Sequence, residues 1–379
     1  MSAVLKVMTI LGTRPELIKM SRVIAELDRH VKHVLVHTGQ NYDFELNEIF
    51  FEDLEIRKPD YFLEAAGENP AQTIARVIEK SDEVMAKESP DAVMLYGDTN
   101  SCLAVIAAKR RKIPVFHMEA GNRCFDQQVP EELNRKVLDH LSDINLVLTE
   151  HARRYLIAEG IRPETIIKTG SHMREVLDYY MPKIQSSDVL MRMGLEQGLY
   201  FIVSMHREEN VDTPENLTDL VQTLNALAEQ YQIPVIVSTH PRTQKRLSVH
   251  NSFKMDSHIQ FLKPFGFCDY VRLQTEALCV VSDSGTLTEE CSLLNLPAVT
   301  IRNAHERPEG MDVGSLIMAG LKKDSVLDAV RVIVAQHQRN IRVMAPVMDY
   351  EAQSVSKKVL RIVLSYTDYV NRTVWRKAL

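Results

Sequence analysis

The amino-acid sequence predicts an α/β protein made of two successive doubly wound domains, each built on a parallel sheet. Short apolar runs alternate with segments of helical period, which indicates βαβ units joined by right-handed crossovers. This alternation lapses between residues 170 and 190 and then begins again. With 379 residues, the chain is also longer than one hydrophobic core usually serves.

The first half of the chain contains strand candidates that are rich in Val, Ile and Leu and bounded by Gly, Pro or Asp, as buried parallel strands are. They are expected at residues 4–11, 33–37, 92–96, 114–118, 144–149 and 166–169. Helices are expected between them, at residues 17–27, 71–86, 103–109 and 132–141.

The second half repeats this pattern, with strand candidates at residues 200–204, 234–239, 259–263, 278–282 and 298–301. Helices are expected at residues 215–231, 270–277, 288–294 and 326–336. We therefore expect an N-terminal domain at 1–170 and a C-terminal domain at 171–351. Residues 352–379 are expected to form a helix that packs back on the first domain.

Charge and composition argue against several classes of partner. The formal net charge is −6 with acids and bases mixed along the chain, whereas a nucleic-acid-binding protein would show a basic surplus. No apolar run reaches the roughly 18 residues of a membrane span, and the N-terminus lacks a signal-peptide pattern. The five cysteines show no CxxC or metal-like spacing, which fits a reducing compartment. We expect a cytoplasmic protein with no nucleic-acid or membrane partner.

Carboxylates are unusually dense after the strand candidate at 114–118. Residues 116–135 contain four of them: Glu119, Asp126, Glu131 and Glu132. Such groups beside a buried strand are costly unless they are solvated, paired or in use. Asp98 ends the preceding strand, so in a parallel sheet Asp98 and Glu119 lie at the edge where open α/β sheets bind ligands. The alternative is a solvated loop and a helix start, and we expect this ordinary role for Asp126 and Glu132.

Two loops have features of phosphate-binding sites. The first strand is followed by GTRPE (12–16), in which Thr13 and Glu16 have capping-box spacing, and Arg14 and Lys19 add positive charge. The alternative is a well-capped helix with a surface arginine. The loop is not GxGxxG, so a dinucleotide is not indicated.

The matching loop of the second half is SDSGTLTEE (282–290). Ser284 and the helix N-terminus suit a diphosphate, and Gly285 allows close approach of the backbone. Glu290 suits the hydroxyls of a ribose. One such loop is weak evidence, but a pair of them favours a ligand that both domains bind.

Histidine and arginine also follow strands in the second half. His206 with Arg207, and His240 before Pro241, end two strands, while Arg302 and Arg307 lie beyond the last. These positions suit substrate or phosphate contact, although ordinary loop residues are the alternative. HExxH and GxSxG patterns are missing from the sequence, so we expect no metal and no serine-hydrolase chemistry.

Seven motifs in this order resemble those of the non-hydrolysing UDP-N-acetylglucosamine 2-epimerases, over nearly the whole chain. They are GTRPE (12–16), GDT (97–99), HMEAG (117–121), PEELNR (130–135), HREEN (206–210), DSG (283–285) with Glu289 and Glu290, and ERPE (306–309). The resemblance implies a GT-B architecture, in which two Rossmann-like domains close a cleft over a UDP-N-acetylhexosamine. It also implies a homodimer that needs no cofactor.

The resemblance further implies a two-step reaction, in which UDP is eliminated anti across C1–C2 to give a 2-acetamidoglycal and then adds back after C2 is re-protonated on its other face. Carried over by motif, the catalytic residues are Asp98, Glu119, Glu131 and His206. The UDP-sugar-binding residues are Arg14, Lys19, Arg123, Arg207, His240, Ser284, Gly285, Thr286, Glu290 and Arg307.

The motifs depart from the common family pattern around the expected sugar pocket. Asn100 and Ser101 follow GDT, Asn122 and Cys124 change EAGLRT to EAGNRC, and Thr286 replaces a glycine. These departures resemble the capsule and O-antigen branch, which interconverts UDP-2-acetamido-2,6-dideoxy-L-talose and UDP-N-acetyl-L-fucosamine. The alternatives are the UDP-GlcNAc/UDP-ManNAc reaction, a hydrolysing relative, a GT-B glycosyltransferase, and a UDP-sugar-binding protein without activity.

Overall fold

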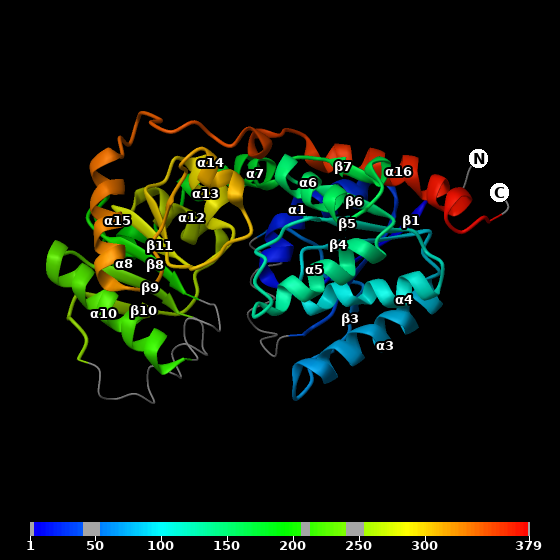
Figure 1. The fold of residues 1–379 in the computed structure, drawn as a ribbon, viewed down its shortest axis with the longest axis horizontal. Coiled ribbons are helices and arrows are strands. Elements are labelled where there is room, and N and C mark those ends of the chain that lie inside the picture. The colour runs from blue at the N-terminus through cyan, green and yellow to red at the C-terminus, as the bar shows by residue number, and fades with distance from the viewer. Residues whose placement is uncertain (1–3, 41–53, 206–212, 240–253, 378–379) are drawn as a thin grey trace. The chain divides into compact units, whose positions relative to one another are not determined.

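The computed structural model describes residues 4–40, 54–205, 213–239 and 254–377 (Figure 1). The chain forms two compact units. Unit 1 comprises Met1–Asp178 together with Met348–Leu379, and unit 2 comprises Tyr179–Val347. Unit 1 is therefore discontinuous in sequence, and unit 2 is inserted between its two parts.

Unit 1 is built on a seven-stranded sheet in the order β3-β2-β1-β4-β5-β6-β7, and its neighbouring strands pair in parallel. The strands are β1 (Lys6–Leu11), β2 (Lys32–His37), β3 (Tyr61–Phe62), β4 (Ala92–Tyr96), β5 (Val115–Met118), β6 (Ile144–Val147) and β7 (Ile166–Lys168). The order of the strands reverses between β1 and β4. This switch point is where doubly wound sheets bind ligands.

The helices that connect these parallel strands are α1 (Arg14–His30), α3 (Pro70–Glu88), η1 (Asn100–Ala104), α4 (Val105–Arg110), α5 (Pro130–Leu141), α6 (Glu150–Ala158) and η2 (Pro163–Thr165). After the last strand, α7 (Met173–Gln185) runs from unit 1 into unit 2, and η3 (Met348–Glu351) and α16 (Val355–Thr373) belong to unit 1. Proline lies in the first turn of α1, α3 and α5, where its missing N–H costs nothing. The C-terminal helix α16 packs against α1.

Unit 2 repeats the same strand order in a six-stranded parallel sheet, β10-β9-β8-β11-β12-β13. Its strands are β8 (Phe201–Met205), β9 (Val235–Thr239), β10 (Ile259–Leu262), β11 (Cys279–Ser282), β12 (Ala298–Thr300) and β13 (Ile317–Met318). Its helices are α8 (Val189–Met193), α10 (Pro214–Tyr231), α12 (Phe267–Glu276), α13 (Leu287–Leu294), α14 (Pro308–Asp312) and α15 (Lys323–Gln336).

The predicted α/β class is confirmed, and each predicted strand corresponds to a strand of the structure. The sequence did not reveal β3 and β13, because two residues are too few to show a pattern. Helices α1 and α12 begin three residues before their predicted starts, at Arg14 and Phe267. Among the described residues, no helix is both long and apolar enough to cross a membrane.

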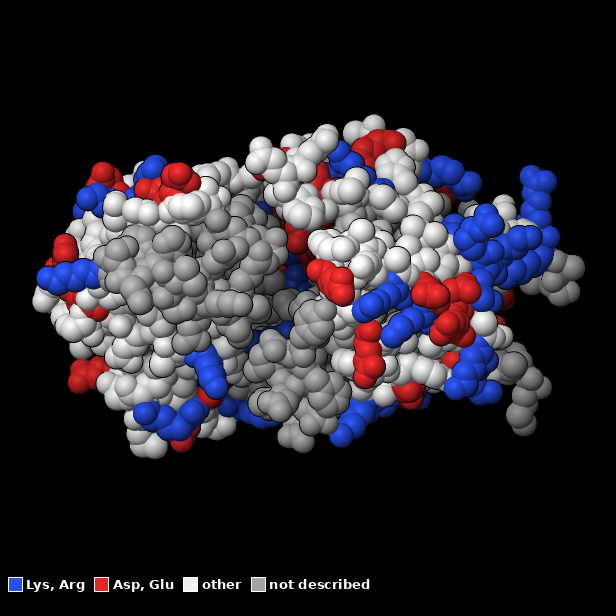
Figure 2. Space-filling view, turned by 90° about the horizontal axis from the view of Figure 1, so that it is seen from below, with Lys and Arg blue, Asp and Glu red and all other residues white. Residues whose placement is uncertain are grey.

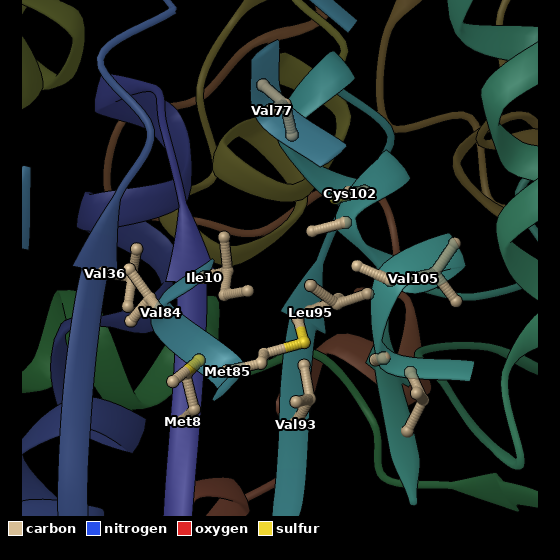
Figure 3. Close-up of a cluster of buried hydrophobic side chains, with 14 of the residues drawn as sticks. Met8, Ile10, Val36, Val77, Val84, Met85, Val93, Leu95, Cys102 and Val105 are labelled. Carbon is tan, nitrogen blue, oxygen red and sulfur yellow. The ribbon is translucent and has the colours of Figure 1, made fainter. Parts of the chain in front are cut away.

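Side chains from the central strands and from the helices over them form a close-packed core on one side of the unit 1 sheet (Figure 3). Met8 and Ile10 of β1 pack with Val93 and Leu95 of β4. Helix α3 covers them with Val77, Val84 and Met85. This packing fixes β1 against β4 and so sets the positions of the loops that leave them. On the face shown in Figure 2, basic and acidic side chains of unit 1 are interspersed.

Replacing Leu95 by alanine should lower the free energy of unfolding by about 2–5 kcal/mol, because the fully buried side chain would leave a cavity between β4 and α3. Urea denaturation followed by far-UV circular dichroism measures this change. The control is Leu364→Ala, whose leucine is 51% exposed in the same unit and should change stability by less than about 0.5 kcal/mol. Equal losses in the two variants would contradict the described core.

Candidate active site

The loop after β1 turns sharply into α1, and its amides are used within the protein. Glycine is required at position 12, because a Cβ there would overlap the hydroxyls of Thr38 and Ser101. The Gly12 and Thr13 amides donate to Glu16 Oε2 over 2.6 and 3.0 Å. Two of the amides that suited a phosphate are thus occupied by a carboxylate. The capping interaction predicted for Glu16 is confirmed.

Glu16 also reaches the loop after β4, since its Oε1 lies 2.6 Å from Thr99 Oγ1. Its side chain is almost completely buried. Burial raises the pKa of Glu16 to about 7, even though hydrogen bonds from Thr99 and from the Gly12 and Thr13 amides favour the ionised form. A carboxyl that titrates near neutral pH therefore lies at the switch point.

Glu119 directly follows β5 in a left-handed backbone conformation, with φ of 67°. Lys19 Nζ donates to Glu119 Oε2 over 2.7 Å, and the Tyr96 hydroxyl donates to the same oxygen. The side-chain nitrogen of Asn122, Nδ2, lies 3.4 Å from Glu119 Oε1. Lys19 was expected at the diphosphate or the cleft, and its buried ammonium pairs with a predicted catalytic carboxylate. Sequence reasoning missed Tyr96, because an aromatic residue at the end of an apolar strand looks like core.

Asp98 follows β4, the neighbour of β5, so the predicted placement of Asp98 and Glu119 at one sheet edge is confirmed. Arg135 Nε donates to Asp98 Oδ2 over 2.8 Å, and Asn134 Nδ2 donates to the Asp98 carbonyl over 2.9 Å. Both residues lie on α5, whose first turn also carries the half-buried Glu131. Helix α5 therefore brings a cation to one predicted catalytic residue and carries another.

Glu132 holds this arginine in place. Its Oε2 accepts a hydrogen bond from Arg135 Nη1 over 2.9 Å, and its carboxylate also accepts from the amides of Cys124 and Phe125. Burial acts to raise the pKa of Glu132, but the Cys124 amide and Arg135 outweigh it and hold the pKa below its usual value. Glu132 is the helix-start acid that was expected, since it lies in the first turn of α5, and it also holds Arg135. Asp126, which accepts from the Gln128 amide, is the ordinary loop acid that was expected.

A second buried network lies behind the Asp98 loop. His117 Nδ1 lies 2.8 Å from Asp139 Oδ1, and its Nε2 lies 2.8 Å from the Gly97 carbonyl. The imidazole ring of His117 thus lies between two groups that accept hydrogen bonds. The pKa of Asp139 is held below its usual value, because the hydrogen bond from His117 and the charge of Arg123 outweigh the effect of burial.

Arg123 belongs to this network. Its Nη1 donates to Asp139 Oδ2, and its Nε and Nη2 donate to the two carboxylate oxygens of Glu159, each over 2.7 Å. The Arg123 side chain is 0% exposed. The sequence analysis predicted that Arg123 binds the substrate. To do so, its guanidinium would have to leave the carboxylates of Asp139 and Glu159. Arg14 occupies the first position of α1 and is half-buried.

The corresponding loop of unit 2 joins β11 to α13 through residues 283–286. The Ser284 amide donates to Ser282 Oγ over 3.0 Å, and Ser284 Oγ lies 2.9 Å from Thr286 Oγ1. A Cβ at Gly285 would overlap Glu306 Oε1, so glycine allows this loop to approach the segment after β12. Glu290 lies in the first turn of α13 and accepts from Gln274 Nε2 over 2.7 Å.

Arg307 lies beside this loop but is engaged with carboxylates. Its Nη2 donates to Glu289 Oε2 over 2.9 Å, and its Nη1 lies 3.5 Å from Glu306 Oε1. Arg302 donates to the other oxygen of Glu306 over 2.7 Å. These buried ion pairs fix the segment that follows β12. The remaining predicted site residues, His206, Arg207 and His240, lie outside the described residues.

Asp139→Asn should lower the free energy of unfolding at pH 7 by about 3–5 kcal/mol, because the buried Arg123 guanidinium would lose a carboxylate that also binds the His117 ring. Since the folded-state pKa of Asp139 is depressed, its contribution is present above the unfolded-state pKa and is lost as pH falls through the folded-state value. Urea denaturation at pH 7 and at a series of pH values falling below 3.8 measures both effects. Asp178→Asn, which breaks an exposed pair with Arg174, should cost less than about 1 kcal/mol. Similar losses in the two variants would contradict a structural role for the buried network.

Comparison with known proteins agrees with the motifs and the fold. A family model described as UDP-N-acetylglucosamine 2-epimerase matches residues 25–364. The UDP-N-acetylglucosamine 2-epimerase of Methanococcus maripaludis is 36% identical over 340 residues, which cover 88% of this chain and 93% of the relative. The UDP-2,3-diacetamido-2,3-dideoxy-D-glucuronate 2-epimerase of Pseudomonas aeruginosa is 34% identical over 334 residues, which cover 86% and 92% of the two chains.

Solved structures show the same architecture. The UDP-N-acetylglucosamine 2-epimerase of Rickettsia bellii superimposes with a TM-score of 0.93 at 59% identity and covers 99% of this chain and 100% of its own. The Methanocaldococcus jannaschii UDP-GlcNAc 2-epimerase, solved with UDP-GlcNAc and UDP, gives 0.87 at 31% identity, with 95% and 100% covered. The predicted GT-B type of fold, with two doubly wound units, is confirmed. The chain therefore belongs to the non-hydrolysing UDP-N-acetylglucosamine 2-epimerase family and is an isomerase of the UDP-sugar 2-epimerase type.

Proposed function

We propose that this protein inverts C2 of a UDP-N-acetylhexosamine, with UDP-N-acetylglucosamine and its C2 epimer as the substrate pair. One observation carries the proposal: the carboxylates Asp98 and Glu119 follow the adjacent strands β4 and β5, and each contacts a cation. The printed activity of several relatives, and the UDP-GlcNAc bound to the solved Methanocaldococcus jannaschii enzyme, support the choice of substrate.

The proposed reaction begins with removal of the C2 proton by a carboxylate. The electrons of the C2–H bond form the C1=C2 double bond, while the C1–O bond breaks and UDP leaves with its electron pair. UDP then adds back to C1 after a proton is delivered to the opposite face of C2. This sequence needs proton-transfer groups on both faces of the ring. We assign these roles to Asp98, Glu119 and Glu131, with His206 as a further catalytic residue.

The paired cations suit this chemistry. Lys19 and Arg135 balance the negative charge of Glu119 and Asp98, so that both carboxylates can lie near each other at the edge of one sheet. Arg14, at the N-terminus of α1, is proposed to contact the diphosphate. A cation placed where negative charge develops stabilises the transition state of UDP departure.

We propose that the loop of unit 2 binds the nucleotide. The hydroxyls of Ser284 and Thr286 and the open backbone at Gly285 suit a diphosphate at the start of α13. Glu290, fixed by Gln274, suits the ribose hydroxyls. Arg307 then acts by holding the segment beside this loop, because Glu289 occupies its guanidinium. We retain Arg123, Arg207 and His240 as further proposed contacts with the substrate.

A second candidate substrate is the 6-deoxy-L-talose derivative of the capsule and O-antigen branch. It is favoured by two departures from the common family motif, one beside the proposed acid–base residue Glu119 and one beside Glu132, which holds Arg135. Asn122 lies 3.4 Å from Glu119, and Cys124 Sγ lies 3.5 Å from Glu132. Side chains in these positions can change the recognition of the sugar without changing the chemistry at C2.

We further propose a cytoplasmic homodimer. All five cysteines are free, which accords with a reducing compartment. Sedimentation equilibrium of the purified protein tests the dimer directly, because a monomer would give half the expected mass.

Proton NMR in deuterium oxide tests the proposed function. Incubation with UDP-GlcNAc should introduce deuterium at C2 and produce the C2 epimer, and a parallel sample with the L-talose derivative ranks the two substrates. Absence of exchange with either sugar would refute the epimerase proposal. Release of free sugar would indicate a hydrolysing enzyme, and release of UDP that depends on an acceptor would indicate a glycosyltransferase. Calorimetric binding without turnover would indicate a sensor.

Asp98→Asn and Glu131→Gln should each reduce C2 exchange by at least about 100-fold and leave UDP affinity within about twofold of wild type. Each change removes a charge with little change of shape, so proton transfer should suffer while nucleotide binding persists. Exchange rates come from NMR and UDP affinity from calorimetry. Asp126→Asn is the matched control from the same segment and should exchange at the wild-type rate. Wild-type exchange in either active-site variant would remove that residue from the proposed mechanism.

A further inference from the structure

Glu16 is a buried carboxyl that takes no part in the proposed proton transfer. It contacts Thr99, which is the neighbour in the chain of the proposed catalytic residue Asp98. It is 2% exposed and joins the loop after β1 to the loop after β4 through Thr99. Thr99 directly follows Asp98 in the chain. Any change in the contact between Glu16 and Thr99 therefore acts on the residue next to Asp98, a proposed catalytic carboxylate.

The loop that carries Asp98 is held at three successive residues. The Gly97 carbonyl accepts from His117 Nε2 over 2.8 Å, and the Asp98 carboxylate accepts from Arg135 Nε over the same distance. Thr99 is held by Glu16 Oε1 over 2.6 Å. The first two contacts each join a nitrogen of a side chain to an oxygen that accepts. The third joins two groups that can each donate or accept.

The surroundings of Glu16 determine where it carries a proton. Its Oε2 already accepts from the Gly12 and Thr13 amides, which can only donate. A proton on the carboxyl therefore lies on Oε1, between Glu16 and Thr99. The ionised carboxylate accepts a hydrogen bond from the Thr99 hydroxyl, whereas the protonated carboxyl donates to it. Protonation thus reverses this hydrogen bond and leaves the hydroxyl hydrogen of Thr99 available to another acceptor.

Both forms are populated near neutral pH, because burial raises the pKa of Glu16 to about 7. Within the described part of the chain, the charged or titratable groups that act on Glu16 include Asp98 from the loop after β4 and Cys102 from η1. One turn further along α1, Lys19 pairs with Glu119. The negative charge of Asp98 also favours protonation of Glu16.

We propose that Glu16 and Thr99 form a proton-controlled positioning pair, in which the direction of their hydrogen bond sets the placement of the Asp98 loop and hence the rate of proton transfer at C2. This inference rests on the proposed function. Glu16 and Thr99 are positioning residues in this scheme, and Asp98 is the group that acts on the substrate.

The test compares Glu16→Gln, Thr99→Val and Thr99→Ser with the wild type from pH 5 to pH 9. Glu16→Gln keeps the shape but cannot titrate, Thr99→Val removes the hydroxyl, and Thr99→Ser restores it. The control is Glu26→Gln, a second largely buried carboxyl on α1 that pairs with Arg29 and His30. Deuterium exchange at C2 gives kcat and KM, and thermal unfolding gives a readout that needs no activity.

In the wild type, the raised pKa of Glu16 means that its protonated form favours the folded state, so its contribution to stability is lost as pH rises from about 4.5 to about 7. In Glu16→Gln, the thermal midpoint should no longer fall over this pH range because of residue 16. In Thr99→Val, this fall of the thermal midpoint should extend to higher pH, because the Thr99 hydroxyl favours the ionised carboxylate of Glu16. Thr99→Ser and Glu26→Gln should retain the fall of the wild type.

In the exchange assay, Glu16→Gln and Thr99→Val should each lower kcat by about tenfold with KM within about twofold, since misplacing a reacting group affects the chemical step more than binding. The kcat profile of Glu16→Gln should also lose the ionisation near pH 7. Thr99→Ser should stay near the wild type. A wild-type pH profile and kcat in Glu16→Gln would overturn the inference, as would equal behaviour of Thr99→Val and Thr99→Ser. If no variant exchanges deuterium, including the wild type, the proposed function fails; the unfolding profiles then still decide whether the pair titrates as described.

Discussion

The parallel pairing of β1 with β4 is the constraint on which the site in unit 1 depends. It aligns two strands that lie about 85 residues apart in sequence, with Ile10 opposite Leu95, so that the loops leaving them meet at one edge of the sheet. Glu16 can reach Thr99 only because of this alignment. The same edge receives Glu119 from β5, because β5 pairs with β4. The apolar packing that fixes the strands thus determines which polar groups lie together at this edge of the sheet.

Charge balance is the second organising principle of unit 1. Asp98, Glu119 and Asp139 are each accompanied by a cation, which is Arg135, Lys19 and Arg123 respectively. A carboxylate removed from water without such a partner would be severely destabilised. The cations are in turn fixed by further groups, such as Glu132 on Arg135 and Glu159 on Arg123. The cations that neutralise the carboxylates of Asp98 and Glu119 therefore also fix the positions of these side chains.

Much of the fold was predictable, because Val- and Ile-rich runs followed by helical periods have few other solutions. The placement of Asp98 and Glu119 at one edge of the sheet was predictable for the same reason, since each residue follows a strand. The ion pairs were not, because Lys19 and Glu119 are 100 residues apart and nothing local links them. Lys19 and Arg123 therefore looked like ligands for the UDP-sugar, and Glu132 looked like an ordinary helix-start acid. Which cation neutralises which carboxylate depends on three-dimensional packing.

The discontinuity of unit 1 has a consequence for synthesis of the chain. Helix α16 belongs to unit 1 and packs against α1, yet the two are separated by the whole of unit 2. Every residue of unit 2 leaves the ribosome before α16 does, so unit 2 can complete its core while unit 1 still lacks a helix. Until α16 has been made, the face of α1 that it covers has no partner from that segment. Unit 1 is thus completed only after the whole of unit 2 has been synthesised.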